Sequence, residues 1–171
     1  MVIVRKQQDS NAGCIPACAL EVMSQLDPGA TLPTEAELIH TMRTNYGSGF
    51  ERLREAVASL TSTFRVVVHE SSPPISEVAI AANAGALPLV AIDNHKHATG
   101  NSGPMAHCLV IESHDSERAS WVVLDPWPEH PDRYVIPDDR FRTVWCNGFA
   151  VIESTTARRE VEPGEPDGRL K

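Results

Sequence analysis

The stretch from residue 8 to residue 18 reads Gln-Asp-Ser-Asn-Ala-Gly-Cys-Ile-Pro-Ala-Cys, and an apolar helical pattern follows it directly. Apolar residues recur at helical spacing from Ile15 to Leu26, and Pro16 suits a first helical turn, where its missing N–H is not needed. We therefore expect Cys14 at the N-terminus of a helix. Such an end favours an anion, and a cysteine is a strong nucleophile only as thiolate. Cys14 is thus the candidate nucleophile.

The two cysteines of this stretch, Cys14 and Cys18, are expected to differ in reactivity because they occupy different positions on the helix. Cys18 lies one turn further along and shares the apolar stripe with Ile15 and Val22. Burial raises the pKa of a thiol, so we expect Cys18 to be buried and inert. A cysteine near a helix start can also be an ordinary core residue, so the assignment of Cys14 depends on a base elsewhere in the chain.

His107 and Asp125 are the candidate base and its orienting carboxylate. His107 begins one predicted strand and Asp125 ends the next, with a turn centred near Ser116 between them. In an antiparallel hairpin folded there, the two side chains would stand directly opposite on one face. A carboxylate in that place fixes the tautomer of an imidazole and stabilises the imidazolium. The alternative is a surface histidine and a turn-forming Asp-Pro.

Gln8 precedes Cys14 by six residues. A side-chain amide there can donate a hydrogen bond to the oxyanion that forms when a thiolate attacks a carbonyl, with the Cys14 backbone N–H as second donor. Gln7 competes for this role, and the spacing favours Gln8.

The order of the predicted elements indicates an α+β fold, because helical patterns come first and consecutive strands follow. A capping box from Thr34 to Glu37 opens the second helix, and a similar box from Ser48 to Glu51 opens the third. We expect a helical lobe packed on an antiparallel sheet. The predicted helices, with their caps, cover residues 15–26, 34–42, 48–60 and 72–83, and the predicted strands cover 64–68, 87–92, 106–112, 120–124, 133–136 and 144–152.

Length and composition indicate one domain, residues 1–153, followed by a flexible charged tail, 154–171. The net charge of −8 argues against nucleic acid as a partner. No apolar run approaches the roughly 18 residues of a membrane span, and no signal peptide is evident. We expect a cytoplasmic protein, or one secreted without a signal peptide.

Cysteine and histidine spacing favours neither a disulfide framework nor a metal centre. Cys14 and Cys18 resemble half a zinc site, but no second pair with finger-like spacing accompanies them. His95 and His97 lie in a polar segment, 93–104, that we expect to be a loop facing the substrate. We expect no cofactor.

The chain resembles the bacteriocin-processing, double-glycine leader peptidases, a family of papain-like cysteine peptidases. The resemblance implies a papain-like fold in which Cys14 is the nucleophile, His107 the general base and acid, Asp125 its orienting partner and Gln8 part of the oxyanion hole. Gly13 replaces the usual Asp before the nucleophile, and the residue after it is an isoleucine in place of Gly. The resemblance covers roughly residues 5 to 152 and is carried by segments 8–23, 49–53, 106–111, 123–126 and 145–149.

The activity implied by this resemblance is cleavage of a peptide or protein amide bond, after a small residue such as Gly. No transporter segment follows the domain, so we expect a standalone enzyme. It would serve peptide maturation, or act as a bacterial toxin or effector with a cognate inhibitor or immunity protein as partner. The same residues would also serve a deamidase or a transglutaminase-like acyl transferase. A non-catalytic binding module is the third alternative.

Overall fold

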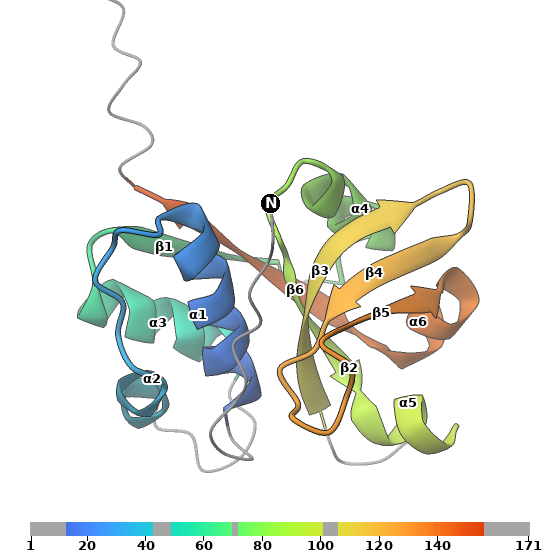
Figure 1. Ribbon diagram of the computed structural model, residues 1–171, viewed down its shortest axis with the longest axis horizontal. Coiled ribbons are helices and arrows are strands. Elements are labelled where there is room, and N and C mark those ends of the chain that lie inside the picture. The colour runs from blue at the N-terminus through green and yellow to red at the C-terminus, as the bar shows by residue number, and fades with distance from the viewer. Residues whose placement is uncertain (1–12, 43–48, 70–71, 101–105, 156–171) are drawn as a thin grey trace, which may run out of the picture.

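The computed structural model describes residues 13–42, 49–69, 72–100 and 106–155, which form a mixed structure of helices and strands (Figure 1). Its elements in chain order are α1 (Cys14–Leu26), α2 (Glu35–Met42), α3 (Phe50–Leu60), β1 (Phe64–His69), α4 (Ile75–Asn83), β2 (Leu89–Asp93), α5 (Asn94–Thr99), β3 (Ala106–Asp115), β4 (Ser120–Leu124), β5 (Arg133–Pro137), α6 (Asp138–Val144) and β6 (Trp145–Ser154).

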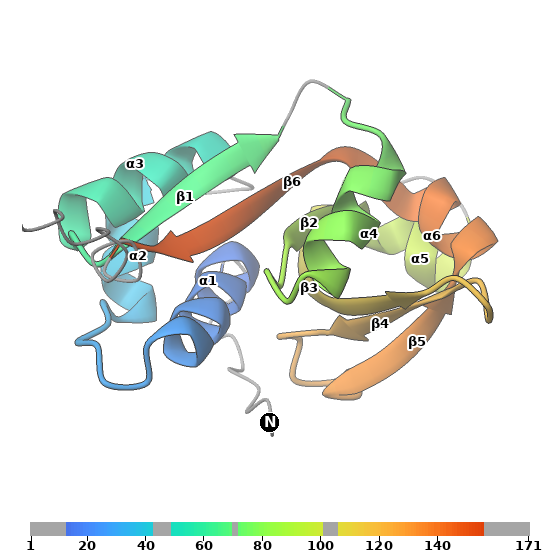
Figure 2. The ribbon, with the colours of Figure 1, turned by 90° about the horizontal axis from the view of Figure 1, so that it is seen from above.

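The strands form a single six-stranded antiparallel sheet in the order β1-β6-β2-β3-β4-β5. The predicted α+β class is therefore confirmed. The last strand, β6, joins two parts of the molecule (Figure 2). On one side it pairs with β1, and on the other with β2. We call α1–α3 with β1 the helical lobe, and β2–β5 with α4–α6 the sheet lobe.

Two apolar clusters form the core, and β3 contributes to both. Cys108 and Val110 belong to the cluster under the helical lobe, whereas Leu109 and Ile111 belong to the cluster under α4 and α6. This alternation follows from the two-residue period of a strand, and it makes β3 a strand buried on both faces. Helix α1 packs across β3 and β6, so its N-terminus is fixed relative to the sheet.

Local signals in the sequence account for several element ends. In the box before α2, the Glu37 N–H donates to Thr34 Oγ1 at 3.1 Å, and the Thr34 N–H donates to Glu37 Oε2 at 2.7 Å. Gly85 has φ +80°, the left-handed conformation that favours glycine after a helix. The third helix begins one residue later than its box predicts, with Gly49 as N-cap, and Ser48 lies outside the described residues.

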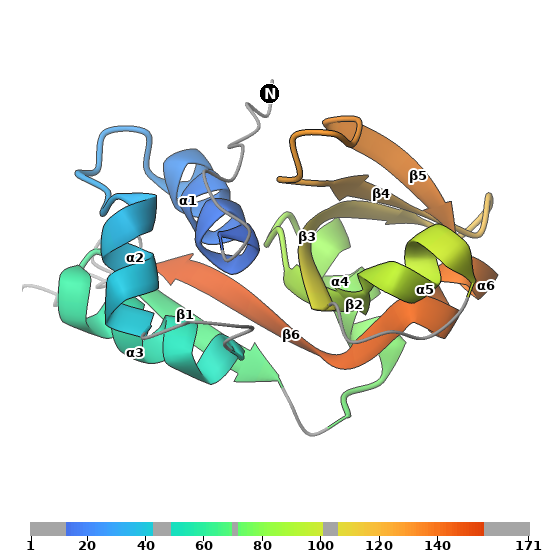
Figure 3. The same ribbon diagram turned by 90° about the horizontal axis from the view of Figure 1, so that it is seen from below.

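Two short helices were not predicted. The segment expected to be a loop contains α5, because the Asp93 side chain accepts a hydrogen bond from the Lys96 N–H at 2.8 Å and Gly100 ends the helix in the left-handed conformation. The loop prediction is therefore wrong over the residues of α5. Helix α6 precedes β6 and lies beside α5 (Figure 3).

Residues 101–105 of the predicted loop and residues 156–171 of the predicted tail lie outside the described part of the chain. Within the described part, no helix has the length and apolarity needed to cross a membrane.

Phe141 provides a test of the core under α4 and α6. Its side chain is fully buried and its ring lies 4.6 Å from that of Trp121. We expect Phe141→Ala to lower the free energy of unfolding by about 3–5 kcal/mol, because a buried aromatic ring is lost and a cavity remains. Arg142→Ala, exposed on the same helix, should change it by less than about 0.5 kcal/mol. Urea denaturation monitored by circular dichroism measures the free energy of unfolding of both variants. Equal losses of this free energy in the two variants would contradict the packing of Phe141.

Candidate active site

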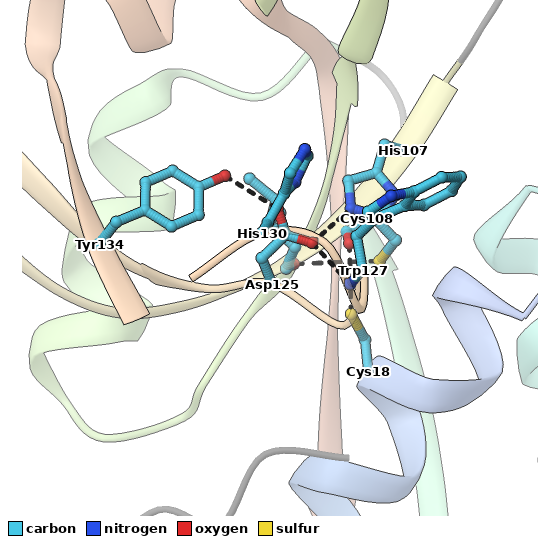
Figure 4. Close-up of polar contacts among 8 residues, drawn as sticks. Cys18, His107, Cys108, Asp125, Trp127, His130 and Tyr134 are labelled. Carbon is cyan, nitrogen blue, oxygen red and sulfur yellow. Dashed lines mark hydrogen bonds and ion pairs between the residues drawn. The ribbon is translucent and has the colours of Figure 1, made fainter. Parts of the chain in front are cut away.

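Cys14, His107 and Asp125 come together from three separate elements. Cys14 is the first residue of α1, His107 is the second residue of β3, and Asp125 directly follows β4. Cys14 lies beside His107, and hydrogen bonding and charge from Cys14 contribute to the raised pKa of that imidazole. His107 Nε2 lies 2.7 Å from Asp125 Oδ1 (Figure 4). Because the Nε2 side of the ring faces Asp125, Nδ1 remains for the thiol.

The imidazole and the carboxylate are buried, with 4% of His107 and 1% of Asp125 exposed, whereas Cys14 is half-buried. Burial acts to lower the pKa of His107, but the hydrogen bonds to Asp125 and Cys14 outweigh it and raise the pKa to about 9. Burial acts to raise the pKa of Asp125, but hydrogen bonding to His107 outweighs it and lowers the pKa to about 2. At neutral pH the pair is therefore an imidazolium and a carboxylate. An imidazolium beside a thiol at a helix N-terminus stabilises the thiolate.

The predicted hairpin register is wrong by two residues next to the site. A turn centred at Ser116 would pair Ile111 with Trp121, but Ile111 pairs with Val123. The register shifts between Ile111 and Ser113, and the turn itself begins only after Asp115. A shift of two residues leaves every side chain on its original face. His107 and Asp125 therefore meet as diagonal neighbours instead of directly opposite residues.

Asp125 accepts hydrogen bonds from four groups, of which the sequence predicted only His107. The Trp127 backbone N–H donates to Oδ1 at 2.9 Å. His130 Nδ1 and the Tyr134 hydroxyl lie 2.7 Å and 3.0 Å from Oδ2 (Figure 4). Burial, followed by the charge of Asp125, raises the pKa of Tyr134, so its hydroxyl remains a donor.

The sequence contains signals for two of these four hydrogen bonds, those from Trp127 and Tyr134. An Asp before a turn commonly accepts from the N–H two residues on, and Asp125-Pro-Trp has that form. Tyr134 pairs with Val123 in the hairpin of β4 and β5, which places it on the face of Asp125. No local pattern indicates His130, because its ring reaches Asp125 only through the path of the intervening loop.

The ring of Trp127 partly covers the base. Its centroid lies 5.7 Å from that of His107, with the rings nearly perpendicular. An edge-to-face contact of this kind is favourable for aromatic rings. The half-buried indole also excludes water from one side of the ion pair, which strengthens the electrostatic interactions there.

Of the other cysteines, Cys108 is buried and Cys18 and Cys146 have raised pKa values, so they are poorer nucleophiles. Cys18 is buried, as predicted, and its thiol donates to the Cys108 carbonyl at 3.4 Å. Burial, followed by hydrogen bonding with Cys108, raises the pKa of Cys18 well above its ordinary value. Partial burial and the nearby Asp93 raise the pKa of Cys146. Chemistry at a thiol is therefore favoured at Cys14.

A metal ion has one candidate cluster among the described residues. The ligand atoms of His107, Asp125 and His130 lie within 4.8 Å of one another. Each carboxylate oxygen of Asp125 already accepts two hydrogen bonds, so the protein's own donors account for the cluster. Cys14 and Cys18 belong to no such cluster in the described part of the chain.

Gln8, the predicted oxyanion donor, lies outside the described residues.

Three solved structures with a similar fold are peptidase domains or proteases of transporters. The peptidase domain of Streptococcus ComA, a bifunctional ABC transporter involved in a quorum-sensing pathway, superposes with a TM-score of 0.63 at 17% identity, over 87% of this chain and 96% of that one. A double-glycine motif protease from an AMS/PCAT transporter, solved with its leader peptide, gives 0.59 at 11% identity over 87% and 89%. The peptidase domain of Streptococcus mutans ComA gives 0.55 at 14% identity over 86% and 96%.

The fold is that of the double-glycine leader peptidases. The fold implied by the sequence resemblance is thus confirmed. No family model and no curated protein matches the chain. At these identities the double-glycine peptidase fold is shared, while the roles of Cys14, His107 and Asp125 depend on the geometry described above.

Alkylation tests which thiol is activated. We expect iodoacetamide at pH 7 to modify Cys14 first, to about one equivalent, because only this thiol lies beside an imidazolium at a helix N-terminus. Cys14→Ala should slow the first modification by about tenfold or more, whereas Cys18→Ser and Cys146→Ser should leave it unchanged. Peptide mass spectrometry identifies the modified residue. A fast reaction that survives Cys14→Ala and disappears in Cys18→Ser would show that the wrong thiol was chosen.

The His107 pair also predicts a pH dependence. Because the pKa of His107 is raised from 6.5 to about 9, its contribution to the free energy of unfolding is full below pH 6.5 and is lost as the pH rises through about 9. We expect one histidine resonance to titrate with a midpoint of about 9 by NMR. Asp125→Asn should move that midpoint down toward 6.5, since the carboxylate is the main group that raises it. An unchanged midpoint in Asp125→Asn would contradict the ion pair.

Proposed function

We propose that this protein is a papain-like cysteine peptidase that cleaves a peptide amide bond with Cys14 as nucleophile. The observation that supports the proposal is the buried His107–Asp125 pair, whose imidazole lies beside a half-buried thiol at a helix N-terminus. Nucleophile, base and orienting group are in contact in that order, which is the arrangement that thiol hydrolysis requires.

The reaction proceeds in two steps on this geometry. The Cys14 thiolate attacks the scissile carbonyl and forms a carbon–sulfur bond, while the Cys14 backbone N–H and the predicted donor Gln8 hold the oxyanion. His107 gives its proton to the leaving amine as the amide bond breaks, and a thioester remains. Water then attacks the thioester with His107 as base, and the acid product leaves as the thiol is restored. Asp125 keeps the ring in place throughout.

For the substrate we propose a peptide or protein with a small residue such as Gly before the cleaved bond. The support is the fold shared with a double-glycine motif protease that was solved with its leader peptide. Gly13 and Ile15, which replace the family's usual residues, are the chain neighbours of Cys14, and we propose that they affect which peptide is recognised. Peptide maturation and a toxin or effector role both fit such an enzyme.

The experiment is incubation of the purified protein with a peptide library that presents Gly, Ala, Ser or Leu before the scissile bond, followed by mass spectrometry. We expect two fragments from peptides with small residues. Cys14→Ala and His107→Ala should reduce cleavage by about 10⁴-fold or more, and Asp125→Ala by a smaller factor, because an orienting group usually contributes less than the nucleophile and base. Cys18→Ser, the control, should cleave at the wild-type rate once corrected for folded protein.

Other outcomes would replace the proposal. A gain of about one dalton on a glutamine-containing peptide, without fragments, would identify a deamidase, and a new amide link would identify an acyl transferase, since both use the same thioester. Binding without any covalent change in wild type and Cys14→Ala would identify a binding module.

A further inference from the structure

His130 is a second histidine on the carboxylate of Asp125. Its Nδ1 lies 2.7 Å from Oδ2, while His107 Nε2 lies 2.7 Å from Oδ1. The two rings are nearly perpendicular, with centroids 6.3 Å apart. About a third of the His130 side chain is exposed, whereas Asp125 is buried. The carboxylate is therefore shared by two imidazoles, one on each oxygen.

We propose that His130 is a positioning residue of this site: it holds the Asp125 carboxylate in the plane that directs Oδ1 at His107 and draws part of the carboxylate's negative charge to Oδ2. The proposal rests on the proposed function for its effect on catalysis. Its effect on His107 itself does not depend on any substrate.

The loop after β4 brings His130 to this position. The Asp125 N–H donates to the Asp132 carbonyl at 3.4 Å, and the His130 N–H donates to the Trp127 carbonyl at 3.1 Å. These bonds turn the chain back on itself. The ring of His130 therefore reaches the side chain of Asp125, which lies five residues earlier at the start of the same loop. The Trp127 and His130 rings lie 6.2 Å apart. One hydrogen bond from His130 thus ties together the carboxylate and the loop that carries the indole over His107.

The orientation of a carboxylate is set by the donors on both of its oxygens. Oδ2 of Asp125 has two donors, His130 from the loop and Tyr134 from β5. Without His130, Oδ2 keeps a single side-chain donor and the carboxylate can rotate about its terminal torsion, which is broad for Asp. A misdirected Oδ1 would leave His107 less well oriented toward Cys14, which lowers the rate of the chemical steps.

The charge on the carboxylate is also divided between its donors. A hydrogen bond to a charged group favours its charged form, so each donor makes Asp125 a weaker base. Loss of His130, one of the two donors on Oδ2, leaves more negative charge on Oδ1, so the carboxylate holds the proton of His107 more strongly. Removal of His130 and removal of the Asp125 charge should therefore move the pKa of His107 in opposite directions. General loss of structure would not produce that pair of results.

Other titratable and charged groups surround His130, and the variants below leave all of them in place. His97 of α5 is neutral near pH 7 because burial, followed by the nearby Arg140, lowers its pKa, and its ring stacks on Tyr134 at 6.1 Å. The groups are His107 on β3, Asp125 after β4, Glu129 and Asp132 in the loop, Tyr134 on β5, His97 on α5 and Arg140 on α6.

Two variants separate the donor of His130 from its ring. His130→Asn keeps an N–H donor near the place of Nδ1 without the ring, and His130→Phe keeps the ring without a donor. His40→Ala is the matched control, because it removes an exposed imidazole from α2. All are measured on the full chain after circular dichroism and urea denaturation have shown that each is folded.

We expect His130→Phe to raise the NMR midpoint of His107 by about half a unit and to lower kcat/KM by about threefold to tenfold, mainly through kcat. His130→Asn and His40→Ala should stay near wild type in both measurements. A His107 midpoint that is unchanged or lowered in His130→Phe, or equal effects in His130→Phe and His130→Asn, would overturn the proposal. Because the midpoint needs no substrate, a raised midpoint in a protein without peptidase activity would reject the proposed function and keep this role of His130.

Discussion

The carboxylate of Asp125 is the charge on which the rest of the site depends. A carboxylate taken out of water costs several kcal/mol unless hydrogen bonds and an opposite charge replace the lost hydration. Asp125 is 1% exposed and accepts from His107, Trp127, His130 and Tyr134. The donors come from β3, from β5 and from the loop that Asp125 itself begins. Their arrangement keeps the carboxylate ionised, and the ionised carboxylate keeps His107 protonated beside Cys14.

Tertiary packing, and not closeness in the sequence, brings the Cys14 thiol to the His107–Asp125 pair. Helix α1 belongs to the helical lobe, whereas the imidazole and carboxylate belong to the sheet lobe. Strand β6 pairs with strands of both lobes, and β3 contributes side chains to both core clusters. The first turn of α1 is thereby held against the start of β3. The Cys14–His107 contact is a property of the interface between the lobes, so disturbance of either core can change it.

The sequence predicted the elements with strong local signals and missed those set by tertiary structure. Helix α1 and its first residue followed from periodicity and from a proline that suits a first turn. The meeting of His107 and Asp125 was predicted on the correct face but in the wrong register, because a shift in a strand and the length of a turn leave no periodic trace. Helices α5 and α6 are too short for a clear period. His130 joins the site through loop closure, which no local pattern reports.

The two departures from the family's usual residues, Gly13 and Ile15, add no polar side-chain atom to this network. Ile15 is partly buried and packs against the core of the helical lobe, and Gly13 is the buried N-cap of α1. Neither side chain contributes a donor or acceptor to Asp125 or His107, since isoleucine and glycine side chains have no polar atoms. The hydrogen bonds that hold Asp125 and His107 therefore do not depend on the side chains at these two positions. A changed residue beside the proposed nucleophile thus leaves the donors on Asp125, and the ion pair that they support, the same.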